Sequence, residues 1–102
     1  MKKQLTTKRF TATLLEGHKE AAFEVPFDPE KEWDMKAQQL WRGRRGHHVH
    51  GIVKGIAFKS VIVPRSRHFY VLIHDDLRKN AKLSIGDVAT LTLKITPLPK
   101  KH

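Results

Sequence analysis

Three histidines near the middle of the 102-residue chain have the spacing that comes closest to a metal site. His47, His48 and His50 are close in sequence, and on an extended strand His48 and His50 would share one face. Two imidazoles can bind zinc, but a site needs at least a third ligand, which His68 or His74 would have to supply from another segment. We therefore rank a metal-assisted enzyme as the weakest of three functional hypotheses and expect no cofactor.

Motifs for other kinds of catalysis are missing from the sequence. There is no cysteine to act as a nucleophile, no G-x-S-x-G sequence around any serine and no glycine-rich phosphate loop. The adjacent pair Asp75-Asp76 is better explained as the start of a helix than as a pair of catalytic carboxylates. We therefore expect a binding module and not an enzyme.

The distribution of charge gives the main functional signal. The chain has 20 Lys and Arg residues against 10 Asp and Glu, a formal net charge of +10. Residues 1–34 hold six basic and seven acidic residues, whereas residues 35–102 hold fourteen basic and three acidic ones. A field of this kind attracts polyanions, so nucleic acid or another polyanion is the expected partner.

The segment RGRRG at residues 42–46 is the most suggestive basic stretch, because guanidinium groups can fork onto phosphate oxygens. A solvated loop is the alternative reading of the same residues. Three further basic residues fall in the two turns that follow along the chain. The candidate polyanion-binding residues are Arg42, Arg44, Arg45, Lys54, Arg65 and Arg67.

The two tryptophans support an alternative function. Asp28 and Pro29 resemble a helix start, and Trp33, Ala37, Leu40 and Trp41 follow at helical spacing, which predicts a helix from Pro29 to about Arg42. Such a face belongs most often to a core. If it is exposed, Trp33 and Trp41 could hold a small molecule or a protein partner at the mouth of a barrel.

The clearest structural pattern is a hairpin in residues 48–63, with Lys54-Gly55 as its turn. Its second half mixes apolar residues of both parities, which predicts either a bulge near Lys59-Ser60 or burial on both faces, and Pro64 should end the pairing. The other apolar patterns complete a set of six expected strands. These cover residues 10–14, 21–25, 48–53, 56–63, 68–73 and 88–95.

These elements predict a mainly β fold, a small antiparallel β-barrel of about six strands with two short helices. The second helix should begin at Asp75-Asp76, with Leu77 and Ala81 facing inward. The length indicates a single domain over residues 1–102, with flexible tails at 1–7 and 97–102. With no apolar run of membrane-spanning length and no signal-peptide pattern, we expect a cytoplasmic location.

Several of these segments, in this order, resemble a bacterial and archaeal family known only as a domain of unknown function (DUF1905). The matching residues are Val25-Pro26-Phe27-Asp28, Gly51-Ile52-Val53-Lys54-Gly55 with Phe58 and Pro64, Leu77-Arg78-Lys79, and Gly86-Asp87-Val88. The resemblance covers about Phe10 to Ile95 and implies a small β-barrel with short helices; it implies no activity. The chain departs from the family in two places: its expected tryptophan-bearing helix and basic segment 42–46 look longer and more basic, and Val88 is followed by Ala89 where the family usually has a β-branched pair.

The segment from Leu77 to Val88 also looks like part of the swapped-hairpin barrels of bacterial transition-state regulators and antitoxins. Those proteins bind DNA as dimers through basic sheets. A helix, a turn and a strand can produce the same short pattern, so this second resemblance adds little to the charge argument.

Overall fold

The computed structural model of the chain describes residues 7–17 and 20–95. The tails expected at 1–7 and 97–102 fall outside these residues, apart from Thr7, which begins the first strand. In the described residues, the elements follow in this order: β1 (Thr7–Leu15), β2 (Ala21–Val25), α1 (Pro29–Trp33), β3 (Gln38–Trp41), β4 (Arg44–Val53), β5 (Ile56–Arg65), β6 (His68–Ile73), α2 (Asp75–Asn80) and β7 (Val88–Ile95).

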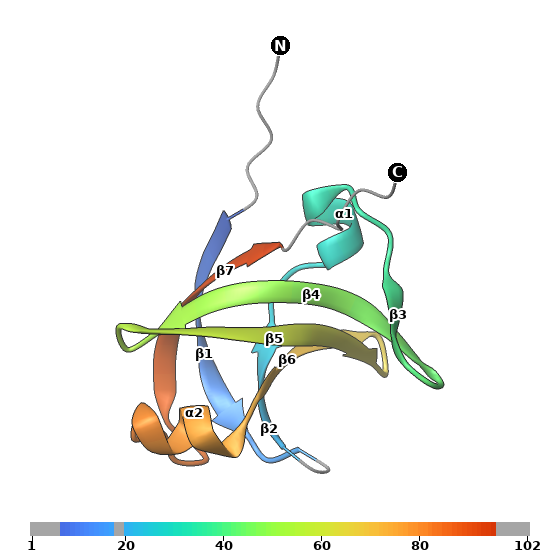
Figure 1. The fold of residues 1–102 in the computed structure, drawn as a ribbon. Helices are drawn as coiled ribbons and strands as arrows, with labels where there is room; N and C mark the ends of the chain where they lie inside the picture. Colours follow the sequence, from blue (N-terminus) through green and yellow to red (C-terminus); the bar gives the residue numbers. More distant parts are fainter. Residues whose placement is uncertain (1–6, 18–19, 96–102) are drawn as a thin grey trace, which may run out of the picture.

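Six of these strands form a closed antiparallel barrel, as the alternating patterns predict (Figure 1). The strand order is β4-β5-β6-β2-β1-β7, and pairing of β7 with the second half of β4 closes the circle. In β7 the residues Ala89, Leu91, Leu93 and Ile95 are buried, and the residues between them face outward. Alternation with a period of two residues therefore places one face of each strand inside the barrel.

The hairpin of β4 and β5 is confirmed and is longer than its apolar pattern suggests. Lys54 and Gly55 both have positive φ, at 51° and 79°, which matches the twist of a two-residue hairpin turn. The register from Val53↔Ile56 to His47↔Ile62 is unbroken, so the predicted bulge is absent from this pairing. The alternative prediction, burial on both faces of the strand, is confirmed near the end of β5. There the successive residues Ile62 and Val63, which face opposite sides, are both buried.

Pro64 lies just beyond the end of one of the two pairings of β5 and within the other. The pairing with β4 stops at Ile62, two residues before the proline, whereas the pairing with β6 continues through Pro64↔Phe69 to Arg65↔His68. At Pro64, β5 is paired with β6 but no longer with β4. Proline lacks an N–H group, so it is tolerated at such a position, where one side of the strand is an edge.

The prediction of one helix from Pro29 to about Arg42 is wrong. Helix α1 ends at Trp33, because Asp34 adopts a left-handed conformation (φ 52°) and caps the helix through its N–H group. The chain then forms β3, and Arg42-Gly43 makes a tight turn into β4, with φ of 77° at Gly43. The helical spacing of apolar residues therefore led to a wrong assignment for a short strand. The left-handed residue at 34 ends the helix, and the one at 43 forms the turn after β3.

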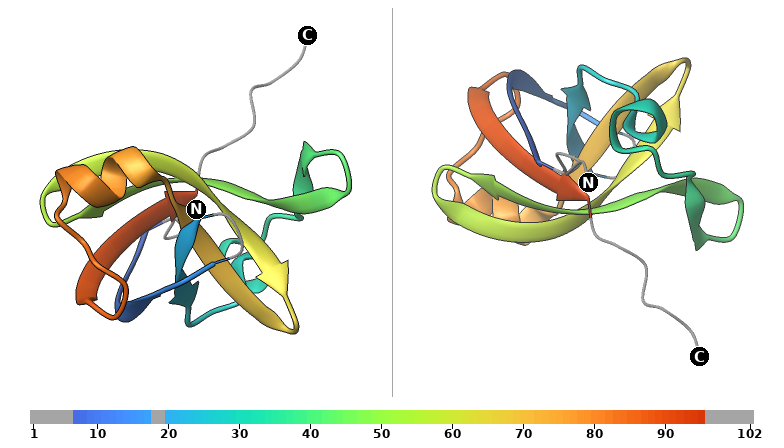
Figure 2. Two further views of the ribbon diagram at one scale, coloured as in Figure 1. Left: turned by 90° about the horizontal axis from the view of Figure 1, so that it is seen from below. Right: turned by 90° about the horizontal axis from the view of Figure 1, so that it is seen from above.

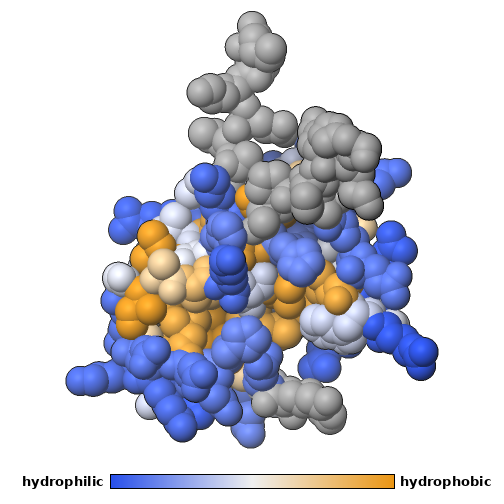
Figure 3. Space-filling view, in the orientation of Figure 1, coloured by the Kyte–Doolittle hydropathy of each residue, from blue (hydrophilic) through white to orange (hydrophobic). Residues whose placement is uncertain are grey.

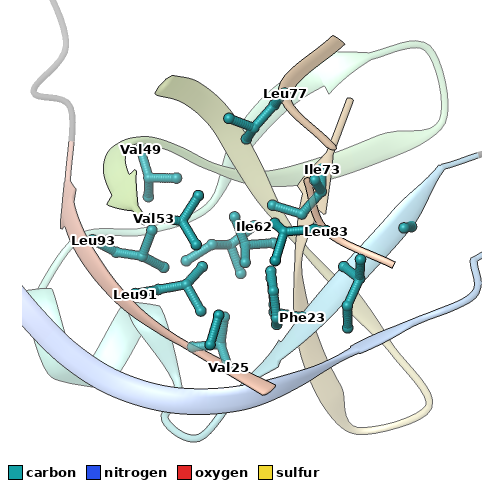
Figure 4. Packing of buried hydrophobic residues seen from close by; sticks show 14 of the residues in the cluster. Phe23, Val25, Val49, Val53, Ile62, Ile73, Leu77, Leu83, Leu91 and Leu93 are labelled. Atoms are coloured by element: carbon teal, nitrogen blue, oxygen red, sulfur yellow. The ribbon is translucent and has the colours of Figure 1, made fainter. Parts of the chain in front are cut away.

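The two helices lie at opposite ends of the barrel (Figure 1). Trp33 of α1 is buried, and its ring packs edge-on against Phe27, with 5.1 Å between the ring centroids. At the other end, Leu77 of α2 and the following residues Ala81 and Leu83 are buried in the same core, as expected for Leu77 and Ala81. Figure 4 shows the apolar side chains of opposite strands pointing toward one another within the barrel.

Strand β3 and the start of β4 project from the barrel. Arg44, Arg45 and Gly46 pair with β3 alone, because the pairings of β4 with β5 and β7 begin only at His47 and Val49. Both views in Figure 2 show this β3–β4 hairpin reaching away from the barrel and diverging from the β5–β6 hairpin.

Candidate functional site

Five of the six candidate polyanion-binding residues lie on two neighbouring hairpins, which we call the arginine end. Arg42, Arg44 and Arg45 belong to the β3–β4 hairpin, and Arg65 and Arg67 belong to the β5–β6 hairpin. The turn of the second hairpin is tight, since Ser66 and Arg67 both have positive φ, at 51° and 70°. The fold therefore places arginines from positions 42–45 and 65–67 at one end of the molecule.

Two hydrogen bonds anchor arginine side chains of the first hairpin. The Nη1 atom of Arg44 donates to the backbone oxygen of Pro64 at 3.2 Å, and the Nη2 atom of Arg45 donates to that of Ala37 at 3.4 Å. Among residues 7–17 and 20–95, no carboxylate oxygen lies within 4.0 Å of the five guanidinium groups. Their charge is therefore available to an anion from outside.

Lys54 does not join the arginine end. It lies in the β4–β5 turn, at the far end of the ten-residue strand β4 from Arg44. A strand advances about 3.4 Å per residue, so roughly 30 Å separates the two positions. A single small ligand cannot contact both of them, and only an extended polyanion could do so.

A groove of about 580 Å³ begins at the arginine end and crosses the outside of the barrel. It runs over β5, β6 and β2 to the loop between β1 and β2, as the strand order requires. Its apolar walls and floor are formed by Leu15, Ala22, Trp41, Val63, Tyr70 and Leu72. Its charged residues are Arg44 and Arg65 from β4 and β5, and Glu16 and Glu20 from the β1–β2 connection.

The structure separates the two tryptophans that were expected on one face. Trp33 is 3% exposed and packs in the core, where its Nε1 atom has no hydrogen-bond partner among the described residues. Trp41 is 49% exposed on β3 and lines the groove. The structure does not bring the two tryptophans to one surface: of the two, only Trp41 lines the groove.

The histidines do not come together as a metal site. His47 points inward and is buried, and its Nε2 atom lies 2.6 Å from the backbone oxygen of Met35, to which it donates. His48 and His50 are both exposed on the outer face of β4, as their spacing predicts. The described part of the chain contains no group of three or more His, Asp and Glu side chains placed to hold a metal ion.

His68 and His74, the suggested third ligands, are each engaged with a carboxylate on the outside of the barrel. The Nδ1 atom of His68 lies 2.7 Å from Glu24, and that of His74 lies 2.6 Å from Glu20. The second pair holds the Glu20 side chain at the acidic end of the groove.

Sequence reasoning missed the groove floor, although a signal was present. Val63, Tyr70 and Leu72 point to the outside of the barrel, where polar residues are usual, and Val63 pairs directly with Tyr70. Outward apolar residues on two adjacent strands are the mark of a covered or binding surface. The apolar run at positions 68–73 contained this signal. The strand order is needed to show that Val63 of β5 lies next to it.

A second basic feature was also missed. Lys59 lies opposite His50, and His50 lies opposite Lys94, so these three residues form a row across β5, β4 and β7 on the outer face. Strands β4, β5 and β7 contain no acidic residue. Figure 3 shows a mixed surface on this face, where β4 and β5 lie in front, with hydrophilic residues between hydrophobic ones. We call Lys59, His50 and Lys94 the lysine row.

One family model matches the chain, over residues 10–93, and the family is described as a domain of unknown function (DUF1905). The match covers most of the barrel, from β1 to β7. No curated protein matches the sequence. Within the described residues, no helix has the length and apolar character needed to cross a membrane.

Proposed function

The chain belongs to this family of domains of unknown function, and from the geometry of the site we propose that it is a non-catalytic module that binds nucleic acid through its arginine end. The observation that carries the proposal is the placement of five arginines on two adjacent hairpins, with no carboxylate within 4.0 Å among the described residues. Guanidinium groups bind phosphate oxygens in forked pairs and remain charged at any physiological pH.

Each arginine would contact the phosphate backbone and would not read the base sequence. Binding would be driven largely by release of the counterions that surround the nucleic acid, so it must weaken as salt increases. With about four or five phosphate contacts on duplex DNA, the logarithm of the association constant should fall against the logarithm of salt concentration with a slope of roughly −4.

Three lysines outside the arginine end offer a matched control for this proposal: Lys54 in the β4–β5 turn, and Lys59 and Lys94 of the lysine row. Replacing Arg42, Arg44 and Arg45 with glutamine removes three charges from the arginine end, whereas replacing Lys54, Lys59 and Lys94 removes three charges from other positions. Both variants have the same net charge. We expect the arginine variant to lose affinity and to show a salt slope about three units shallower, at about one unit per lost contact.

The measurement is a fluorescence titration of a labelled oligonucleotide at several salt concentrations, with circular dichroism to verify folding of each variant. Equal loss of affinity in the two variants would show that the overall charge, and not the arginine end, drives binding. No binding of the unaltered protein at low salt would overturn the proposal altogether.

A second candidate function is binding of a small molecule in the groove beside Trp41. The observation in its favour is an apolar groove of about 580 Å³ with charged residues at its two ends, a size within the usual range for ligand sites. A ligand screen monitored by Trp41 fluorescence tests it. Compounds that bind without competing with nucleic acid would favour this candidate over the first.

A further inference from the structure

The groove has opposite charges at its two ends, which polyanion binding alone does not require. Arg44 and Arg65 line the groove at the arginine end, while Glu16 and Glu20 line it at the β1–β2 loop. Two carboxylates in the path of a phosphate backbone would repel it. The ligand that fits both ends is therefore anionic at one end and a hydrogen-bond donor at the other.

We propose that the groove holds one unpaired nucleotide of a single strand, with its phosphate at Arg44 and Arg65 and its base edge toward Glu16 and Glu20. This inference rests on the proposed binding of nucleic acid and names the form that binds. A nucleotide has the required polarity, since its phosphate is anionic and the bases cytosine, adenine and guanine carry amino groups that donate hydrogen bonds.

The dimensions of the groove agree with this arrangement. Arg65 pairs with His68, at the start of β6, whereas Glu20 lies beside Ala21, which pairs with Ile73 at the end of that strand. Five to six residues of strand correspond to roughly 20 Å between the two backbone positions. The long arginine and glutamate side chains shorten this gap between charged groups, which leaves room for a base and its sugar.

The apolar part of the groove supplies surfaces for the base. Trp41 is 49% exposed on one wall, directly opposite Arg44 in the β3–β4 pairing, and Tyr70 lies on the floor beside Val63. Base–aromatic stacking is a main source of affinity in proteins that bind single strands. A base inside a duplex is already stacked and paired, so it cannot enter the groove without unpairing.

The remaining arginines favour a nucleic-acid strand over a free nucleotide as the ligand. Arg42, Arg45 and Arg67 belong to the same two hairpins but do not line the groove. They are placed to meet the phosphates that precede and follow the inserted nucleotide. Glu20 is held in place by His74, at 2.6 Å between Oε2 and Nδ1, so its second oxygen can accept a hydrogen bond from an amino group.

The first test compares oligocytidine, oligouridine and a duplex of equal length with the mononucleotide CMP. We expect the single strands to bind more tightly than the duplex and far more tightly than CMP, with a change in Trp41 emission. Oligocytidine should bind roughly fivefold or more tightly than oligouridine, which presents an oxygen where cytosine presents an amino group.

Two variants and one control locate the binding. Trp41→Ala should weaken oligocytidine binding by about tenfold, within the range for loss of one stacking contact, and Glu16→Gln should reduce the preference for cytidine. Ile52→Ala is the control, because Ile52 is equally exposed at 49% and lies on the outer face of β4 outside the groove. It should change neither quantity.

Duplex binding as tight as single-strand binding, with no change in Trp41 emission, would overturn this inference and leave the proposed function intact. CMP binding as tight as that of the strand would overturn it in favour of a free nucleotide. Absence of salt-dependent binding to any nucleic acid would overturn the proposed function together with the inference.

Discussion

The side chain of Arg44 bridges to the backbone oxygen of Pro64, at 3.2 Å from Nη1. This contact lies beyond the last backbone pair between β4 and β5, which is His47↔Ile62. A side chain thus continues the connection between two strands where their backbone pairing has stopped. It also ties the projecting β3–β4 hairpin to the β5–β6 hairpin.

Replacing Arg44 with alanine should therefore loosen the β3–β4 hairpin more than it destabilises the barrel. We expect faster amide hydrogen exchange in residues 38–46 and a loss of unfolding free energy of about 1 kcal/mol or less, as for an exposed hydrogen bond. Arg42→Ala removes the same charge, and no hydrogen bond of that side chain is seen among the described residues, so it serves as the control. Equal exchange rates in the two variants would contradict this role.

The two tryptophans should differ in their fluorescence. Trp41 is 49% exposed, whereas Trp33 is 3% exposed, so a soluble quencher such as acrylamide should reach the first and not the second. Trp41→Phe should remove the quenchable, red-shifted part of the emission and leave a blue-shifted remainder. Had the two residues shared one buried helical face, neither would be quenched, and that result would contradict the position of β3.

His47 should be more important for stability than its neighbour His48. The buried His47 ring donates to the backbone oxygen of Met35, which connects β4 to the segment after α1. His47→Leu leaves that oxygen without its donor and should cost about 1–3 kcal/mol of unfolding free energy, while His47→Gln keeps a donor and should cost less. Urea unfolding measures both.

His48→Leu provides the comparison for that series, because His48 is exposed on the outer face of the same strand. Its effect should stay within about 0.5 kcal/mol, as for most surface substitutions. A cost as large as that of His47→Leu would mean that the hydrogen bond to Met35 is not the reason for the effect.

The two glycines of the RGRRG segment should respond differently to substitution. A side chain at Gly46 would overlap the backbone oxygen of Ile62 and lie 2.8 Å from Leu40 Cδ1, whereas nothing lies within 4 Å of a side chain at Gly43. Gly46→Ala should therefore cost about 2–3 kcal/mol, since a backbone must move. Thermal unfolding would test this.

Gly43→Asn should cost about 1 kcal/mol or less, because asparagine tolerates the left-handed conformation that this turn requires (φ 77°). Similar melting temperatures for Gly46→Ala and Gly43→Asn would be incompatible with the close approach of β4 to β5 at Gly46.

Local patterns were sufficient for most of the barrel. The alternation in residues 88–95 and the Lys54-Gly55 turn are confirmed in β7 and in the β4–β5 hairpin, because both depend on residues that are neighbours in sequence. The family resemblance is confirmed over residues 10–93. The excess of positive charge in residues 35–102 is likewise evident from the sequence alone. The polyanion binding that it suggests stays a prediction.

The segment from Trp33 to Gly46 shows where local patterns fail. Trp33, Leu40 and Trp41 fit a helical period, yet they lie in a helix and a strand, since the left-handed turn at Asp34 and the hairpin turn at Gly43 divide the segment. A short apolar segment is compatible with either structure, and pairing with another strand decides between them.

The candidate site depends on contacts between residues far apart in sequence. Leu15, Trp41 and Tyr70 line one groove because the strand order of the barrel and the projecting β3–β4 hairpin bring β1, β3 and β6 together. The residue types alone indicated basic and aromatic groups that could bind an anion. Their arrangement, with arginines at one end, carboxylates at the other and Lys54 far away, was decided only by the tertiary structure, because strand order and register determine which outward side chains become neighbours.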